Sequence, residues 1–309
     1  MSAARPSRRD GAYSYVAYGA RIGSFMPLPP LVAAENTAEP DVIVRRGSIP
    51  ATPFETSGSE FQCLVVDDEI WIHCGGVGTF RIRGGREIDV DPAPQAQEFT
   101  LRSYIVKAAL AAILRQQDKL ILHASAVAID GRAAAFIGSS GMGKSTTTAA
   151  LHARGHPVLA DDLVAVDVQH RHGPHVLPGA PHLALLPESA RAIGDDPDRL
   201  PRIAPRSPKH ARDAGRGFAH LPVKLGRIYV LADGERNAVA PIARDDALGA
   251  LVVHTFGRRV FQPTPNAGHF LQCATLVRSV TIKRLERVRD LDQLAQLVTL
   301  VEDDIAGDD

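Results

Sequence analysis

The sequence predicts an α/β fold in two parts, a small β-rich unit followed by a larger domain in which strands and helices alternate. Two observations lead to this expectation. Short β-branched and aromatic segments separated by glycines fill residues 11–98. From residue 120 the chain reads strand, strand, glycine-rich loop, helix, strand, which is the pattern of an α/β core. A length of 309 residues allows one large domain or two smaller ones.

The first part of the chain predicts an antiparallel β unit behind a mobile arm at residues 1–10. Residues 13–22 are rich in aromatic and β-branched side chains and predict a strand, and the polar residues 33–42 predict a loop. Glycines then separate further short segments of strand character. These are residues 42–45, 61–66, 69–73 and 79–82.

A change of period marks the end of the β unit. Apolar side chains within residues 103–117 repeat at helical spacing, so we expect residues 99–119 to form a connecting helix. Strands are expected at 120–129 and 133–137, with a turn at 131–132 between them.

The next elements complete a strand–loop–helix–strand unit. A helix is expected from 144 to 154, ended by Gly155, and a short strand at 157–160. Residues 187–220 are rich in Pro, Arg, Asp and Gly and predict a long polar segment that is a functional loop or is partly disordered.

The C-terminal part continues the same alternation. Strands are predicted at 225–232 and 280–288, and helices at 245–254 and 268–277. Asp290 is placed to cap a last helix. The larger domain is therefore expected to span residues 120–303, followed by an acidic, solvated tail at 304–309.

Composition excludes several classes of function. Lys plus Arg and Asp plus Glu number 35 each, so no net charge attracts the chain to nucleic acid or anionic lipid. No apolar run approaches the ~18 residues of a membrane helix. Arg5, Arg8 and Arg9 precede no apolar stretch, so the N-terminus is not a secretory signal. A cytoplasmic protein without nucleic-acid or membrane partners is expected.

The cysteines predict neither a disulfide framework nor a zinc site. Cys63, Cys74 and Cys273 are odd in number, and no two are spaced as C-x-x-C. His73 stands beside Cys74, but no further ligands are near it in the sequence, so a strand-edge histidine is the better interpretation.

A phosphate-binding loop is the most specific motif of the chain. Residues 138–145 read GSSGMGKS and match G-x-x-x-x-G-K-[ST] in full. Glycine allows the backbone to turn its N–H groups toward phosphate, and the N-terminus of the following helix adds positive field. Only 6 of the 35 basic residues are lysines, and Lys144 is one of them. The pattern predicts ATP contacts at Gly138, Ser139, Ser140, Gly141, Met142, Gly143, Lys144, Ser145 and Thr146.

Polar residues around the next strand supply the remaining candidates. Lys144 is expected to reach the β- and γ-phosphates, and the Ser145 hydroxyl to bind Mg²⁺. Asp161 and Asp162 end the strand after the loop, where a kinase needs a base and a metal ligand. We assign Asp161 as the base and Asp162 to the metal. His123 lies 15 residues before the loop in an apolar strand, where a core histidine is the ordinary interpretation.

The runs LHASAVAI (122–129), GSSGMGKS and RGHPVLADD (154–162) resemble the catalytic domain of HPr kinase/phosphorylase. The resemblance covers residues 120–167 and implies a fold of the HPr kinase and phosphoenolpyruvate carboxykinase type. It implies transfer of phosphate to a seryl hydroxyl of a small protein, with Asp161 as base, Asp162 at Mg²⁺ and His123 beside the transferred phosphate.

The sequence also departs from that family. Residues 176–190 do not match the family's second signature, which puts the reverse phosphorylase reaction and hexameric assembly in doubt. The N-terminal unit contains Tyr18-Gly19 and the run LPPL at 28–31. With these residues it looks like that of a divergent branch of HPr-kinase-related proteins, some of which phosphorylate lasso-peptide precursors. Whether the chain forms a homo-oligomer stays open.

The sequence thus predicts an ATP-dependent serine kinase acting on a peptide or small protein. Two alternatives stay open, a small-molecule kinase of the same fold and an ATP-binding regulator without transfer activity. Lys209, His210 and Arg212 are candidates for a mobile cationic element that closes on the phosphate, although a solvated charge run is the commoner interpretation of such a segment.

Overall fold

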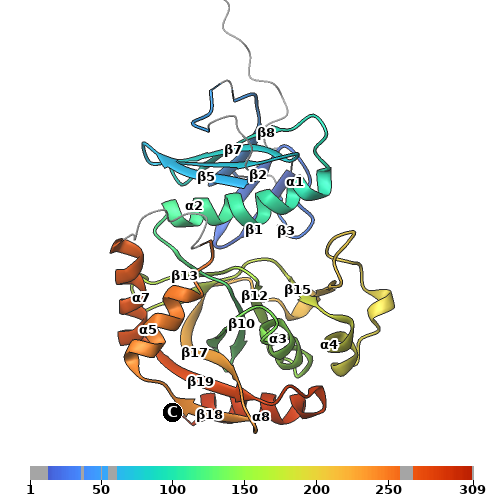
Figure 1. Ribbon diagram of the computed structural model, residues 1–309, viewed down its shortest axis with the longest axis vertical. Coiled ribbons are helices and arrows are strands. Elements are labelled where there is room, and N and C mark those ends of the chain that lie inside the picture. Colours follow the sequence, from blue (N-terminus) through green and yellow to red (C-terminus); the bar gives the residue numbers. More distant parts are fainter. Residues whose placement is uncertain (1–12, 36–37, 50, 55–60, 258–266, 308–309) are drawn as a thin grey trace, which may run out of the picture. The chain divides into compact units, whose positions relative to one another are not determined.

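The computed structural model describes residues 13–35, 38–49, 51–54, 61–257 and 267–307. The protein is a mixed α/β chain with several sheets (Figure 1). It divides into two compact units, Met1–Asp118 with Arg259–Pro263 and Lys119–Arg258 with Thr264–Asp309. The arm expected at 1–10 lies outside the described residues. Within the described ranges, no helix is long and apolar enough to cross a membrane.

Unit 1 is built on an eight-stranded sheet in the order β3-β1-β2-β4-β8-β7-β6-β5. Most neighbours are antiparallel, but β4 runs parallel to β2 and to β8. The strands are β1 (Tyr13–Ala17), β2 (Ala20–Ser24), β3 (Val32–Ala33), β4 (Val42–Arg46), β5 (Phe61–Val66), β6 (Glu69–Cys74), β7 (Gly78–Arg83) and β8 (Glu87–Pro92).

The single strand expected at 13–22 is instead a β-hairpin. Tyr18 and Gly19 both have positive φ, 55° and 76°, between the paired residues Ala17 and Ala20. Two positive-φ residues in a two-residue loop make the hairpin turn whose twist matches that of the flanking strands. The prediction was wrong because Tyr18 does not signal a turn, since a bulky residue seldom adopts positive φ.

One face of the unit 1 sheet packs against a helical segment. It consists of α1 (Glu98–Tyr104), a π-helical turn η1 (Ile105–Ala109) and α2 (Leu110–Gln116), all within unit 1. Tyr104 stacks on Phe80 with ring centroids 5.9 Å apart. The Gln117 amide donates to the carbonyl of Gly85 across 2.7 Å. The predicted connecting helix therefore belongs to the core of the β unit.

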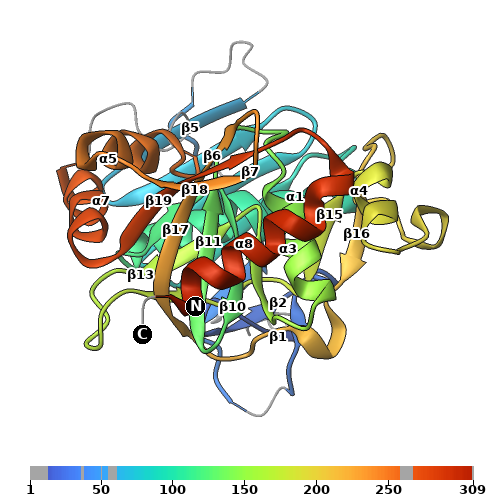
Figure 2. The same cartoon turned by 90° about the horizontal axis from the view of Figure 1, so that it is seen from below.

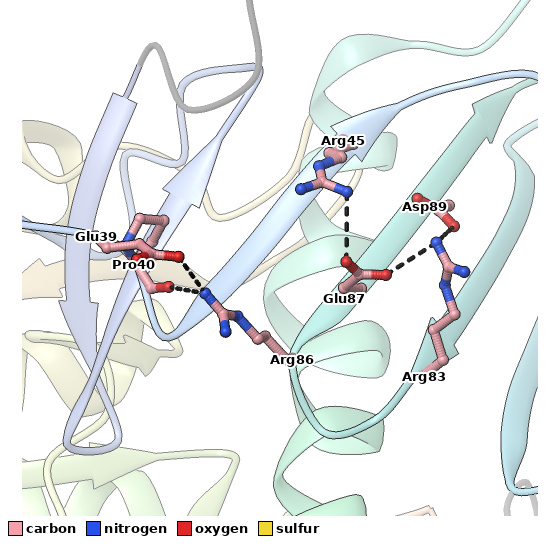
Figure 3. Close-up of polar contacts among 7 residues, drawn as sticks. All are labelled: Glu39, Pro40, Arg45, Arg83, Arg86, Glu87 and Asp89. Carbon is pink, nitrogen blue, oxygen red and sulfur yellow. Dashed lines mark hydrogen bonds and ion pairs between the residues drawn. The ribbon is translucent and has the colours of Figure 1, made fainter. Parts of the chain in front are cut away.

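The opposite face of the sheet carries a ladder of ion pairs (Figure 3). Glu87 lies between Arg45 and Arg83, at 3.4 and 2.9 Å, and Arg83 also contacts Asp89 at 2.9 Å. Side chains alternate between the two faces along each strand, so the residues between these charged ones, such as Ile88, point to the other face and are buried. Side chains this exposed stabilise the sheet only modestly.

Unit 2 is built on a nine-stranded sheet with the order β12-β10-β11-β17-β14-β13-β9, to which β19 adds beside β17 and β18 beside β19. The strands β11, β17 and β19 run parallel. The members are β9 (Leu120–Leu122), β10 (Ala124–Ile129), β11 (Arg132–Ile137), β12 (Val158–Asp161), β13 (Val164–Asp167), β14 (His175–Leu177), β17 (Val223–Asp233), β18 (Ala238–Pro241) and β19 (Thr281–Arg287). The strand expected at 120–129 is interrupted at His123, where the chain passes from β9 to β10.

Helices cover both faces of the unit 2 sheet. On one face, α5 (Arg244–Val253) and α7 (Ala267–Ser279) bury Leu251 and Leu276 against the sheet. On the other, α3 (Lys144–Ala153) and α8 (Leu294–Ala306) lie side by side and bury residues such as Leu151 and Val298 (Figure 2). Both faces of the sheet carry apolar side chains, because helices cover each face and exclude water from it.

The segment predicted as a long loop has its own folded structure. It contains α4 (Pro187–Ala192), the 3₁₀ turns η2 (Pro197–Arg199) and η3 (Gly215–Gly217), and β16 (His210–Asp213). β16 pairs with β15 (His182–Leu185) as a separate two-stranded sheet. Polar, proline-rich composition concealed these short elements.

The predicted acidic tail begins too early. Helix α8, preceded by the 3₁₀ turn η4 (Leu291–Gln293), continues to Ala306. Asp304 accepts from Arg227, Tyr229 and Lys283 at 2.7, 2.7 and 2.6 Å. Arg227 is only 3% exposed, so this carboxylate neutralises a buried cation and fixes the end of α8 to the sheet.

Candidate active site

The strand order of unit 2 brings the predicted site residues to one edge of the sheet. β10 is antiparallel to both β11 and β12, with Ala124 opposite Ile137 and Ser125 opposite Asp161. The C-terminal ends of β11 and β12 and the start of β10 therefore meet. The glycine-rich loop follows β11, Asp161 ends β12, and His123 precedes β10.

The glycine-rich loop turns directly into helix α3. Gly141 and Gly143 have φ of 83° and 84°, a region that L residues rarely adopt, and α3 begins at Lys144. Ser139 and Ser140 are exposed, and Met142 is half-buried. A Cβ on Gly143 would lie 3.1 Å from the Cζ atom of Arg287. Glycine at this position therefore serves both the turn and the close approach of a cation.

Lys144 is folded back over the loop. Its ammonium donates to the carbonyl oxygens of Gly138 and Ser139, at 2.8 and 3.2 Å, and the residue is only 7% exposed. Burial lowers the pKa of Lys144, the charges of Asp161 and Asp162 act to raise it, and that of Lys209 acts to lower it. An ammonium held by neutral carbonyl groups would form a stronger, charge-assisted hydrogen bond with an anion.

Asp161 is bound on both carboxylate oxygens. Its Oδ1 accepts from the hydroxyls of Ser145 and Ser125, at 2.8 and 2.5 Å. Its Oδ2 accepts from the backbone N–H of Ala184 in β15 at 2.8 Å. The carboxylate is therefore fixed beside the Ser145 hydroxyl, which is the group that the loop pattern assigns to Mg²⁺.

Asp162 turns toward the same edge through an unusual backbone conformation. Its φ is 69°, and the N–H of Leu163 bonds to the carbonyl of Asp161 across 2.9 Å, closing a three-residue turn. Its Oδ1 lies 3.3 Å from Nε2 of His123. Both side chains are more than a third exposed, so this pair is open to solvent, unlike Lys144.

The donor set beside the loop fits a magnesium ion bound together with nucleotide phosphates. A serine hydroxyl and a carboxylate are hard oxygen ligands of the kind that Mg²⁺ uses, with phosphate and water completing its shell. Across the described ranges, no group of three or more His, Cys, Asp or Glu is arranged to hold a metal ion.

Two further residues at the site were missed from the sequence. The carbonyl of His254, after α5, accepts from the N–H of His123 at 2.8 Å. Burial lowers the pKa of His254, and the charges of Lys144 and His123 lower it further. Arg287 approaches the loop at the carbonyl of Gly141. No local motif marks either residue, since each arrives from an element distant in sequence.

Of the remaining predicted residues, Lys209 acts on a residue of the site, whereas the others make contacts that hold neighbouring elements together. The Thr146 hydroxyl lies 2.9 Å from that of Ser189 and so connects α3 to α4. Of the predicted cationic element, Lys209 acts electrostatically on Lys144, whereas His210 is buried and contacts the carbonyl of Leu200. Arg212 pairs with Asp195 at 2.5 Å.

The structure also describes the histidine and the cysteines that the sequence analysis set aside. Nδ1 of His73 lies 3.0 Å from the Thr79 hydroxyl, as a strand histidine with a local partner does. The three cysteines are free thiols. Burial raises the pKa of Cys63 and of Cys273 to about 11, which keeps both thiols protonated at neutral pH.

Comparisons with known proteins add little to this geometry. No family model and no curated protein matches the sequence. Among solved structures, the chain is similar to the Hpr(Ser) kinase/phosphatase from Coxiella burnetii at 12% identity and a TM-score of 0.35. That match covers 60% of this chain and 97% of the other. So loose a superposition carries no conclusion about activity.

Proposed function

We propose that this protein is an ATP-dependent kinase that transfers the γ-phosphoryl group to a seryl hydroxyl of a peptide or small protein. The observation that carries the proposal is the hydrogen bond from Ser145 to Asp161 at the end of a complete phosphate-loop motif. Together with Lys144, these groups provide phosphate binding and metal binding at one edge of a sheet.

The contacts favour a reversal of the two aspartate roles that the sequence suggested. Asp161 has three hydrogen-bond donors, one of them Ser145, which suits the metal side of the site. The Asp162 side chain is more than a third exposed, and its Oδ1 lies 3.3 Å from Nε2 of His123. A base needs access to the acceptor hydroxyl, so Asp162 is the better candidate.

The transfer then runs as an in-line displacement. Asp162 accepts the proton of the acceptor hydroxyl while the serine oxygen forms a bond to the γ-phosphorus. The bond from that phosphorus to the β–γ bridging oxygen breaks, and ADP leaves with its electron pair. Lys144 stabilises the charge on the phosphoryl oxygens, and His123 orients Asp162 beside the transferred group. A magnesium ion held by Ser145 and Asp161 would neutralise phosphate charge.

The acceptor is the finer part of the proposal. The resemblance seen in the sequence favours a serine of a ribosomally made precursor, such as that of a lasso peptide. The long folded excursion from β15 to η3 flanks Asp161 through Ala184, which suits a macromolecular acceptor more than a closed small-molecule pocket.

Intact-mass spectrometry provides the test. The protein is mixed with Mg·ATP and a pool of serine-containing peptides and small proteins from the source cell. A gain of about 80 Da on one acceptor, lost in Lys144→Ala and retained in the exposed control Lys224→Ala, is expected. Transfer to free serine or another small molecule would favour the small-molecule kinase. Binding of ATP with no gain of mass on any acceptor would favour the regulator.

A further inference from the structure

A proline-rich hairpin stands between η2 and β16, and we name residues 201–210 the basic hairpin. Its two sides are joined by hydrogen bonds from Ala211 N–H to the carbonyl of Pro201 at 2.8 Å and from Ile203 N–H to that of Lys209 at 3.1 Å. An isolated bridge between Arg202 and His210 lies in the same ladder. The segment is therefore an ordered hairpin, although its composition predicted a loop.

Several restraints hold the tip of the basic hairpin in shape. Three of its ten residues are proline, which restricts the backbone before any ligand binds. The Arg202 guanidinium donates to the carbonyl of Ser207 at 2.8 Å, across the tip. His210 fixes the base through the carbonyl of Leu200 at 2.8 Å. A restrained hairpin loses little conformational entropy on binding a partner.

The charge of the basic hairpin is not neutralised locally. No Asp or Glu occurs between Asp198 and Asp213. The flanking cations have carboxylate partners, because Arg199 pairs with Asp196 and Arg212 with Asp195. Arg202, Arg206 and Lys209 take part in no ion pair within the described ranges. Arg202 and Arg206 are exposed, so a chain of zero net charge has a concentrated positive surface here.

The basic hairpin is fastened to the proposed reaction centre. His210 in β16 pairs with Leu185 in β15, and the neighbouring Ala184 donates its N–H to Asp161. The hydroxyl contact between Thr146 and Ser189 joins the same excursion to α3. Burial is the main cause that lowers the pKa of Lys144, and the charge of Lys209 in the hairpin also acts to lower it.

We propose that the basic hairpin binds carboxylate side chains flanking the acceptor serine, so that the enzyme selects acidic peptides. This inference rests on the proposed kinase function. Lys144 and the loop amides already serve the nucleotide phosphates, which leaves Arg202 and Arg206 on the exposed hairpin for a second anionic partner. An extended acceptor whose serine reaches Asp162 would pass β15 and place its neighbouring residues along the hairpin.

Matched peptides separate this inference from the proposed function. One peptide has serine at its centre flanked by Glu, and the other has Gln at the same positions. With the wild-type protein, kcat/KM for the Glu peptide is expected to exceed that for the Gln peptide by about tenfold, with the preference declining as NaCl rises from about 50 mM to about 300 mM.

The double variant Arg202→Gln/Arg206→Gln should lose the preference through KM for the peptide, with KM for ATP unchanged. Arg278→Gln removes an exposed arginine from α7 and serves as the matched control. A Glu preference that survives the double variant would overturn the inference, as would equal phosphorylation of both peptides by the wild-type protein.

If neither peptide is phosphorylated, that result counts against the proposed function. A binding measurement then still tests the inference about the basic hairpin. Fluorescence anisotropy of the two labelled peptides is then measured with Lys144→Ala, which keeps the basic hairpin but should not transfer phosphate. Tighter binding of the Glu peptide, lost when Arg202→Gln/Arg206→Gln is added, supports the inference. Equal binding of both peptides overturns it.

Discussion

The Ser145 hydroxyl donates to Oδ1 of Asp161 across 2.8 Å, joining the first turn of α3 to the end of β12. These residues are 16 positions apart in the chain. Ser145 follows β11 and Asp161 ends β12, and β10 lies between these two strands in the sheet order. The bond holds a hydroxyl and a carboxylate together beside the glycine-rich loop. The adjacent carboxylate, Asp162, lies with its Oδ1 3.3 Å from Nε2 of His123.

Substitutions of Asp161 and Asp162 should affect phosphoryl transfer in different ways. Asp161→Asn is expected to raise the Mg²⁺ concentration needed for half-maximal transfer, because one negative charge beside Ser145 is lost. Asp162→Asn should leave that concentration unchanged and lower kcat by on the order of 10²- to 10⁴-fold, the usual contribution of a general base. Rates measured over a Mg²⁺ titration distinguish the two. The opposite pattern would restore Asp161 as the base.

The loop glycine next to Lys144 is expected to be intolerant of a side chain. Gly143→Ala forces alanine into φ near 84° and pushes its Cβ toward the Arg287 guanidinium, so ATP affinity should fall by on the order of tenfold or more. Isothermal titration with ATP measures the loss. Unchanged affinity would show that the loop keeps its nucleotide-binding shape without this glycine.

A second glycine provides the matched control. Gly249 is exposed within α5, and a Cβ there would meet no atom within 4 Å. Gly249→Ala should raise the free energy of unfolding by up to about 1 kcal/mol, because alanine is the better helix former. Urea denaturation measures the gain, and ATP affinity should not change. A loss of stability would mean that α5 is distorted at this turn.

The end of α8 depends on one carboxylate. Asp304→Ala should lower the free energy of unfolding of unit 2 by about 3 kcal/mol, since it leaves the buried Arg227 without its carboxylate partner. Asp303→Ala removes a neighbouring exposed carboxylate and should change stability little. Thermal or urea unfolding compares them. Equal effects would contradict the role of the Arg227–Asp304 pair.

The lowered pKa of His254 predicts that the stability of the protein depends on pH. Because burial lowers its pKa below the ordinary value of about 6.5, the unfolded chain binds a proton more readily than the folded chain. The stability that neutral His254 contributes is fully present above its ordinary pKa. It is lost as the pH falls from there through the lower pKa that His254 has in the folded chain. His254→Gln should therefore lose less stability than wild type over this interval. Parallel melting curves between about pH 7.5 and about pH 5 test this.

Much of unit 2 follows from local pattern. The strand at 133–137, the loop and helix α3 were predicted from apolar periodicity and from glycines whose dihedral freedom the loop needs. The strand expected at 120–129 was broken at His123, whose backbone N–H instead pairs with the carbonyl of His254. Nothing local marks that break, because both segments are equally apolar.

The site was only partly predictable. Lys144 and Ser145 are named by the loop motif, and the strand-end position of Asp161 follows from α/β topology. Ser125 lies in a run of small apolar residues, and only the register of β10 against β12 reveals that its hydroxyl faces Asp161. The basic hairpin was hidden for a related reason. Its prolines and charges resemble those of a solvated loop, and the pairing of β15 with β16 involves residues about 28 positions apart.

The sequence by itself determined the glycine-rich loop, the helix that follows it and the α/β alternation around them. These depend on properties of consecutive residues, namely dihedral freedom, side-chain period and helix termination. Tertiary structure alone decided which groups accompany the loop: the three donors on Asp161, the approach of His254 and Arg287, and the anchoring of the basic hairpin. Strand order and register bring these groups together, and both are set by how the whole sheet buries its apolar faces.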